Sequence, residues 1–311
     1  MSTKKLRSIR TWLIRNSRPL DVARWYFQFE DGKAQNVLKA LAAYQNSDGG
    51  FGHGLEPDLR TPYSSPIATW SATLILREIK FPTMANQMID KILNYLDETL
   101  IENRWPTTIP EINEAPHAPW WHFSKENEFW GWNPSVELAA FIIETGKHYP
   151  NIYSKAETII NAAMEDFMSS DYKPEVHELA NFARSGEVLL AMRPDLLPEG
   201  FLNKIRQLIK ETVTSDPTSY QSDNYITTPS FFLNSPKSPY YPAIKEIADY
   251  YCSHLEASVH SKGYWSIPWT WGKDPIHSDS LRDWKGYQIL ENMIYLQHFK
   301  PDYLVKSLSN S

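Results

Sequence analysis

The chain of 311 residues contains a single cysteine, Cys252. One cysteine cannot form an internal disulfide, and it excludes a metal site built of cysteines alone. No apolar stretch approaches the roughly 20 residues that cross a bilayer as a helix. The first residues also lack the apolar segment and cleavage site of a signal peptide. We therefore expect a chain that is neither exported by that route nor membrane-spanning, with a cytoplasmic location.

The sequence also lacks an excess of positive charge, because 37 acidic residues outnumber 31 basic ones. The net charge of −6 gives no overall attraction to phosphate backbones, so we expect no nucleic-acid partner. The first twenty residues differ, since they hold six basic and no acidic side chains. A helix there would place Leu6, Ile9 and Leu13 on one face. This predicts either weak contact with an anionic membrane surface or, as we prefer, an outer helix with a solvated basic face.

Hydrophobic residues make up 42% of the chain and aromatic residues 14%, which is enough for a sizeable core. Helical periodicity recurs along the chain, and no alternating run predicts a sheet, so the fold class is predicted to be all-α in a single domain of residues 1–311. Prolines at the first turns of several segments support the helix starts. The predicted helices cover residues 4–16, 20–29, 32–45, 66–80, 85–102, 134–149, 152–169, 174–192, 198–214, 239–256 and 280–299.

The connections between these helices alternate in character. Some are short, such as residues 81–84, whereas residues 46–65 and 104–133 form long connections rich in glycine, proline and aromatics. A pair of helices recurs about every forty residues, which indicates a repeat of architecture. Such pairs either stack into an open solenoid or close into a ring, and long aromatic loops favour the ring.

Residues 45–52, with the sequence QNSDGGFG, end a predicted helix, turn through aspartate and two glycines, and place Phe51 before another glycine. This segment resembles the Gln…Gly-aromatic repeat of squalene and terpene cyclases and of protein prenyltransferase β-subunits. Weaker echoes follow later helices at residues 103–105 and 262–265. The resemblance implies an α/α toroid, a closed ring of helical hairpins with inner and outer helices. Polysaccharide lyases and other glycan-active enzymes also use helical toroids, so the fold leaves the substrate open.

The loop that follows, residues 53–65, is the best candidate for a site. In a toroid such a loop delivers side chains to the mouth of the central cavity, where a desolvated carboxylate can act as general acid or base. Arginine there can neutralise a carboxylate or bind an anionic group. The competing interpretation is a structural network that fixes a long loop. The candidate catalytic residues are Glu56, Asp58 and His53, and the candidate substrate-binding residues are Arg60 and Tyr63.

A second candidate is the aromatic segment of residues 120–132. Aromatic walls stabilise carbocations in cyclases and stack on sugar faces in carbohydrate-active proteins, and the sequence does not separate these uses. A plain hydrophobic plug is the alternative. The predicted substrate-binding side chains are Trp121, His122, Trp130 and Trp132.

A third candidate spans residues 264–287. It offers Trp265, Trp269 and Trp271 as an aromatic wall, with Arg282 as a substrate-binding cation and Asp283 as a further acid or base. Arg282 and Lys285 fall on one helical face and resemble faintly the diphosphate-binding set of prenyltransferase β-subunits. An exposed helix N-terminus with ordinary charges is the preferred alternative.

Several motifs of the resembled families are absent. The zinc of prenyltransferases needs an Asp-x-Cys pair, but Cys252 follows two tyrosines. Neither the Asp-x-Asp-Asp motif of alkene-protonating cyclases nor a magnesium-binding Asp-Asp-x-x-Asp set is present, and there is no phosphate-binding glycine loop or nucleophile elbow. We therefore expect no metal and no cofactor.

Three hypotheses follow. The leading one is a terpenoid cyclase-like or prenyltransferase-like enzyme that acts on an apolar, isoprenoid-like small molecule by acid catalysis from Glu56 or Asp58. The second is a glycan-active toroid, a hydrolase or lyase with tryptophan-lined subsites. The third is a toroid that binds a small molecule without catalysis. A greasy cavity with one buried carboxylate favours the first, and a groove lined by tryptophans and acids favours the second.

Overall fold

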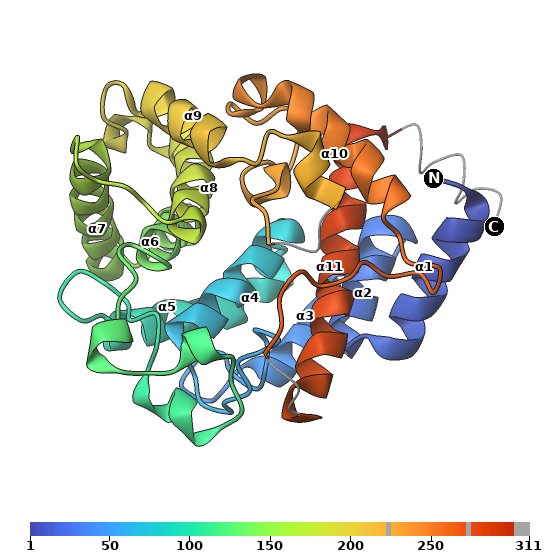
Figure 1. The fold of residues 1–311 in the computed structure, drawn as a ribbon. Coiled ribbons are helices and arrows are strands. Elements are labelled where there is room, and N and C mark those ends of the chain that lie inside the picture. Colours follow the sequence, from blue (N-terminus) through green and yellow to red (C-terminus); the bar gives the residue numbers. More distant parts are fainter. Residues whose placement is uncertain (222–224, 272–274, 302–311) are drawn as a thin grey trace. The chain divides into compact units, whose positions relative to one another are not determined.

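The computed structural model describes residues 1–221, 225–271 and 275–301. Within these residues the chain forms eleven α-helices joined by loops and short 3-10 turns, with no β-strand (Figure 1). The all-α prediction is confirmed, and each predicted helix has an observed counterpart. No helix of the described part has the length and apolar character needed to cross a membrane.

The chain divides into two compact units. Unit 1 contains Met1–Asn36 and the described residues from Arg206 onward, and unit 2 contains Val37–Ile205. Helices α3 (Ala34–Leu41) and α9 (Phe201–Thr212) include the two positions where the chain passes from one unit to the other. The closed ring and the single domain over residues 1–311 stay predictions.

Unit 1 is built around its last helix. Helix α11 (Ser278–Phe299) packs against α1 (Thr3–Asn16), α2 (Pro19–Phe29) and α10 (Lys245–Ala257). The predicted beginning of α10 at residue 239 was wrong. The chain leaves helical geometry at Ile244, where φ is −134° and ψ is 27°, and Tyr241–Ala243 form a separate 3-10 turn.

Helix α1 has the amphipathic character that its sequence predicts. Leu6, Ile9 and Leu13 are all buried in the core. On its basic side, the Lys5 ammonium donates to the Glu256 carbonyl, and Arg10 forms a two-bonded ion pair with Glu30. The apolar face is thus used within the protein, and contact with a membrane surface stays a prediction.

Unit 2 consists of helical hairpins centred on α6 (Ser135–Thr145). This helix packs against α7 (Pro150–Met168) and α8 (Val176–Met192), and it also contacts α4 (Pro66–Glu78), which is followed by α5 (Asn86–Thr99) (Figure 1). Every residue of α6 from Ser135 to Ile143 is buried. A helix apolar on all sides must be covered on all sides, which explains its central position.

The turn at residues 45–52 forms as predicted. The Gln45 amide donates to the carbonyls of Gly49 and Met88, the second of which lies on α5. The Asp48 carboxylate accepts from the Gly50 amide, and Phe51 is fully buried. Because the Phe51 carbonyl also accepts from the amide of Ser65, the residue preceding α4, the turn fixes where α4 begins.

The two partial matches to this turn, at residues 103–105 and 262–265, have the same structural function. The Trp105 indole donates to the Leu96 carbonyl in the last turn of α5, at 2.8 Å. The Trp265 indole donates to the Leu255 carbonyl in the last turn of α10, at 3.0 Å. The last four carbonyls of a helix have no partner within the helix, so each tryptophan satisfies one of them while burying its ring.

The turn yields a test of the fold. Gly49 has a φ of +95°, and a Cβ added there would lie 2.2 Å from the Lys91 carbonyl oxygen. We expect Gly49→Ala to lower the free energy of unfolding by about 1–3 kcal/mol, since strain and overpacking act together. Gly200 is the matched control, because its φ is +83° but the nearest atom to its added Cβ is 3.7 Å away. Equal losses for both alanines in urea denaturation would contradict the packing argument.

Candidate functional site

Asp58, a predicted catalytic residue, is completely buried. Its carboxylate accepts a 2.7 Å hydrogen bond from the Trp121 indole, and its carbonyl accepts from the Ala118 amide. The neighbouring Arg60 amide donates to the Pro116 carbonyl. These contacts tie the loop of residues 53–65 to the segment of residues 116–121, as in the structural interpretation of this loop.

The other predicted residues of this loop point to different surroundings. Glu56 is half-buried and accepts a 3.1 Å hydrogen bond from the Ser71 hydroxyl on α4. His53 is exposed and bonds through its ring to Asn46, and Tyr63 is 49% exposed. The Arg60 guanidinium lies over Gly54, where an added Cβ would come within 2.9 Å of Nη1. Glu56 is thus connected to α4 by a hydrogen bond.

The predicted aromatic segment packs largely on itself. The rings of Trp121 and Trp130 are stacked, with centroids 5.1 Å apart and planes 4° from parallel. The Trp130 indole donates to Asn127, and His122 is exposed with its ring bonded to that of His117 at 3.1 Å. This arrangement has the features of a loop-borne plug, since the rings cover one another.

Trp132 belongs to a separate cluster around Glu178. Its indole donates to Asp166 at 2.9 Å, and the Arg104 guanidinium lies 4.6 Å from its ring centroid. The Trp132 amide and the Tyr172 hydroxyl both donate to one oxygen of the Glu178 carboxyl. Burial raises the pKa of Glu178 above its ordinary value, and these hydrogen bonds offset only part of that effect.

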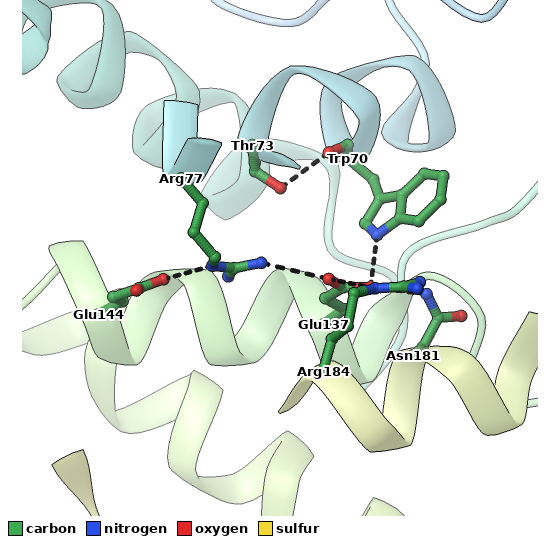
Figure 2. Close-up of polar contacts among 7 residues, drawn as sticks. All are labelled: Trp70, Thr73, Arg77, Glu137, Glu144, Asn181 and Arg184. Atoms are coloured by element: carbon green, nitrogen blue, oxygen red, sulfur yellow. Dashed lines mark hydrogen bonds and ion pairs between the residues drawn. The ribbon is translucent and has the colours of Figure 1, made fainter. Parts of the chain in front are cut away.

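The sequence did not predict a cluster of charges around a buried glutamate in unit 2. Glu137, on α6, is fully buried and is surrounded by side chains of α4 and α8 (Figure 2). From α8, Arg184 donates to both carboxylate oxygens at 2.9 and 3.0 Å, and Asn181 donates at 2.8 Å. From α4, the Trp70 indole donates at 2.8 Å and Arg77 at 3.2 Å.

Glu137 is held in its ionised form. Burial by itself would raise the pKa of this carboxyl, but the positive charges of Arg184 and Arg77 and the hydrogen bonds outweigh that effect and lower the pKa. Arg77 also bonds at 3.0 Å to Glu144, which lies about two turns beyond Glu137 on α6. The positive charges of Arg77 and Arg184 therefore balance the negative charges of Glu137 and Glu144.

Helix α4 presents a half-buried stripe to this cluster. Trp70, Ser71, Leu74, Arg77 and Glu78 are only partly exposed, whereas most other residues of the helix are buried. Their spacing places them on one side of the helix, over about 10 Å from Trp70 to Arg77. Glu56 reaches the beginning of this stripe through Ser71. We call the set of Trp70, Ser71, Arg77, Glu137, Asn181 and Arg184 the α4–α6–α8 face.

Polar atoms in or next to this face are buried without a hydrogen-bond partner among the described residues. Examples are Arg77 Nη2, Asn181 Oδ1 and, one turn beyond Asn181, Ser185 Oγ. Leaving a buried polar group unpaired costs about 1–3 kcal/mol, and water or a polar ligand commonly satisfies such atoms. The face therefore contains polar atoms that no described protein group satisfies.

In unit 1 the third predicted cluster separates into parts. Trp265 caps α10 and is buried, while Trp269 and Trp271 lie edge to face with centroids 6.5 Å apart. Arg282 pairs with Asp279 at 3.1 Å and lies 3.6 Å from the buried Asp283 carboxylate.

Lys285 instead lies over the Tyr264 ring, 4.3 Å from its centroid. Burial lowers the pKa of Lys285, and the nearby charge of Lys262 lowers it further. Arg282 and Lys285 thus contact different groups, which does not resemble a shared phosphate clamp.

Comparison with known proteins finds no matching family model, curated protein or solved structure. Among the described residues no group of three or more His, Cys, Asp or Glu side chains is placed to hold a metal ion. The resemblance to terpenoid cyclases, the absence of a cofactor and the choice of substrate stay predictions.

Glu137 gives the second test. We expect Glu137→Gln to lower the free energy of unfolding at pH 7 by about 3–5 kcal/mol, because the buried carboxylate that pairs with both Arg77 and Arg184 loses its charge. Glu144→Gln is the control, since its side chain is 20% exposed and exposed pairs contribute about 0–1 kcal/mol. A lowered pKa means that the stabilisation exists above the ordinary glutamate pKa and disappears as pH falls through the folded value. The two losses, measured by urea denaturation, would be equal if Glu137 were a minor contributor.

Glu178 gives the opposite expectation. A raised pKa means that its contribution to stability is present at low pH and is lost as pH rises through the folded value. Glutamine keeps an oxygen that accepts from Trp132 and Tyr172 and does not ionise. We therefore expect Glu178→Gln to become more stable relative to wild type between pH 5 and pH 8. A stability difference that stays constant over this range in chemical denaturation would contradict the shift.

Proposed function

We propose that the α4–α6–α8 face binds a neutral saccharide and that Glu56 acts beside it as a general acid or base. The observation that carries this proposal is the composition of the face, in which a half-buried tryptophan adjoins two arginines that are charge-balanced and partly exposed. Sugars combine apolar C–H faces with many hydroxyl groups, so they match such a surface.

The balance of charge argues against an isoprenoid diphosphate as the ligand of this face. Arg77 and Arg184 are already matched by Glu137 and Glu144, and Glu56 adds a further acidic group. A diphosphate is bound by a surplus of cations or by a metal. The polar side chains of this face also differ from the apolar surface expected to bind a hydrocarbon chain. Among the three hypotheses, the glycan-active one therefore has the most support.

Trp70 supplies the aromatic part of the face. Its indole is oriented by the bond to Glu137, and the Arg184 guanidinium lies 5.7 Å from the ring centroid. The fixed orientation lowers the entropic cost of binding a ring against it. Arg184 and Arg77 are 28% and 23% exposed, so their remaining surface is accessible to ligand hydroxyls.

Glu56 is the acid or base in this proposal because of its placement. Asp58 and Glu137 are completely buried, and Glu137 is held ionised by two arginines, so it does not serve as a proton donor near neutral pH. Glu56 is half-buried, and its partner Ser71 is the residue next to Trp70. General acid or base catalysis requires such a group within reach of the ligand.

The α/α toroid and the likeness to terpenoid cyclases and prenyltransferase β-subunits are part of the same proposal. The succession of helical hairpins and the turn of residues 45–52 support them. The lone, buried Cys252 supports a cytoplasmic location.

Binding is tested by isothermal titration with maltotriose, cellotriose and xylotriose, with farnesyl diphosphate as the competing probe. We expect one trisaccharide to bind wild type and Trp70→Ala to weaken it about tenfold, the effect of losing one aromatic stacking contact. Trp120→Ala, which removes a 38% exposed tryptophan outside the face, is the control. Binding of farnesyl diphosphate alone, with dependence on Trp70, would restore the terpenoid hypothesis.

Catalysis is tested on the trisaccharide that binds, by chromatography of the products. We expect Glu56→Gln to lower the rate by about 10²–10⁴ while the Kd changes less than twofold. Unchanged turnover in this variant would remove Glu56 from the mechanism. Tight binding without turnover in wild type would leave the non-catalytic hypothesis.

A further inference from the structure

Unit 1 contains an aromatic cluster that is not explained by the packing of its helices. Trp269 lies edge to face with Trp284 of α11, with centroids 5.1 Å apart and planes at 89°. Tyr225 and Trp271 contact Trp269 edge to face from other directions, and Tyr287 contacts Trp284 in the same way. Tyr225 is 47% exposed, and the other four rings are partly exposed. The cluster is therefore open to solvent on at least one side.

Three hydrogen-bonding atoms at this cluster are buried without a partner among the described residues. They are the indole nitrogens of Trp269 and Trp284 and the amide oxygen of Gln288. Tryptophans in protein interiors ordinarily direct the indole N–H to an acceptor, as Trp25, Trp70, Trp105 and Trp132 do in this chain. Because the two indole donors and the amide acceptor belong to one cluster, we look for a single reason why all three lack a partner.

The three atoms belong to one location. Trp284 and Gln288 are four residues apart on α11, so their side chains leave the same face of the helix. Trp269 is in direct ring contact with Trp284. The three side chains are therefore neighbours in unit 1.

We propose that Trp269, Trp284 and Gln288 form a saccharide-binding surface on unit 1. A hydroxyl group donates and accepts at once, so neighbouring hydroxyls of a sugar can satisfy both indole donors and the amide oxygen while the C–H face of the ring lies on the aromatic side chains. The choice of a saccharide rests on the function proposed for the α4–α6–α8 face, whereas the existence of a polar ligand rests on the three unpaired atoms.

Other ligand classes fit this surface less well. A cation held by these rings would lie beside two N–H donors and no carboxylate of the cluster, and Arg24 already lies 5.6 Å from the Tyr287 ring centroid. An anion would meet the Gln288 oxygen, and the cation of Arg282 is paired with Asp279 and Asp283.

The test observes the indole N–H groups directly. In a two-dimensional ¹⁵N–¹H spectrum of the labelled full chain, Trp269→Phe and Trp284→Phe assign two of the twelve tryptophan signals. We expect both signals to shift on addition of maltotriose, cellotriose or xylotriose. We also expect each variant to weaken binding at this surface about five- to tenfold, read from the titration of the other tryptophan's signal, because phenylalanine keeps an aromatic face and removes the donor. Trp12→Phe, which changes a partly exposed indole of the same unit outside the cluster, should leave the Kd within twofold.

The outcomes separate this proposal from the function proposed above. Binding that depends on Trp70 but leaves the Trp269 and Trp284 signals and variants unaffected overturns the surface on unit 1 and retains the proposed function. Binding that depends on Trp269 and Trp284 but not on Trp70 supports this surface and overturns the site on unit 2. If none of the three trisaccharides binds wild type at millimolar concentration, both proposals are overturned.

Discussion

The arrangement of unit 2 depends on one buried charge. Glu137 lies on the most enclosed helix of the unit, and a carboxylate in that position is tolerated only when several donors surround it. Its donors come from α4 on one side and from α8 on the other. The requirement to neutralise Glu137 therefore fixes how these two helices face α6.

The same requirement shapes the surface on which function is proposed. Because the arginines that neutralise Glu137 are themselves partly exposed, the network that stabilises the interior also provides the polar groups of the α4–α6–α8 face. Buried ion pairs add little net stability compared with apolar packing, although their directional bonds define one geometry. A rigid, charge-balanced wall is suited to orienting a hydroxyl-rich ligand and poorly suited to attracting a highly charged one.

The sequence predicted those features of the fold that depend on interactions between residues close together in the chain. Helix positions, the bond of Gln45 to Gly49 and the tryptophan contacts that follow α5 and α10 all join residues at most ten positions apart. The Glu137 network was missed because its partners are distant, with Arg77 and Arg184 lying 60 and 47 residues away. One signal was available, since a charged residue inside the apolar segment of residues 135–143 requires a partner. The burial of Asp58 beneath Trp121 likewise depends on a contact across 63 residues.

The tryptophans that follow α5 and α10 have a consequence for how loops of this protein can change. Trp105 and Trp265 each fix the first residues of a long loop to the helix that precedes it, through a bond that involves no later part of the loop. Residues between this anchor and the next fixed point of the loop, which for Trp105 is its backbone partner Ser135, can therefore change without altering the end of the helix. Such a design separates the stability of the scaffold from the composition of the loops, so that new specificities can arise by replacing residues beyond each tryptophan.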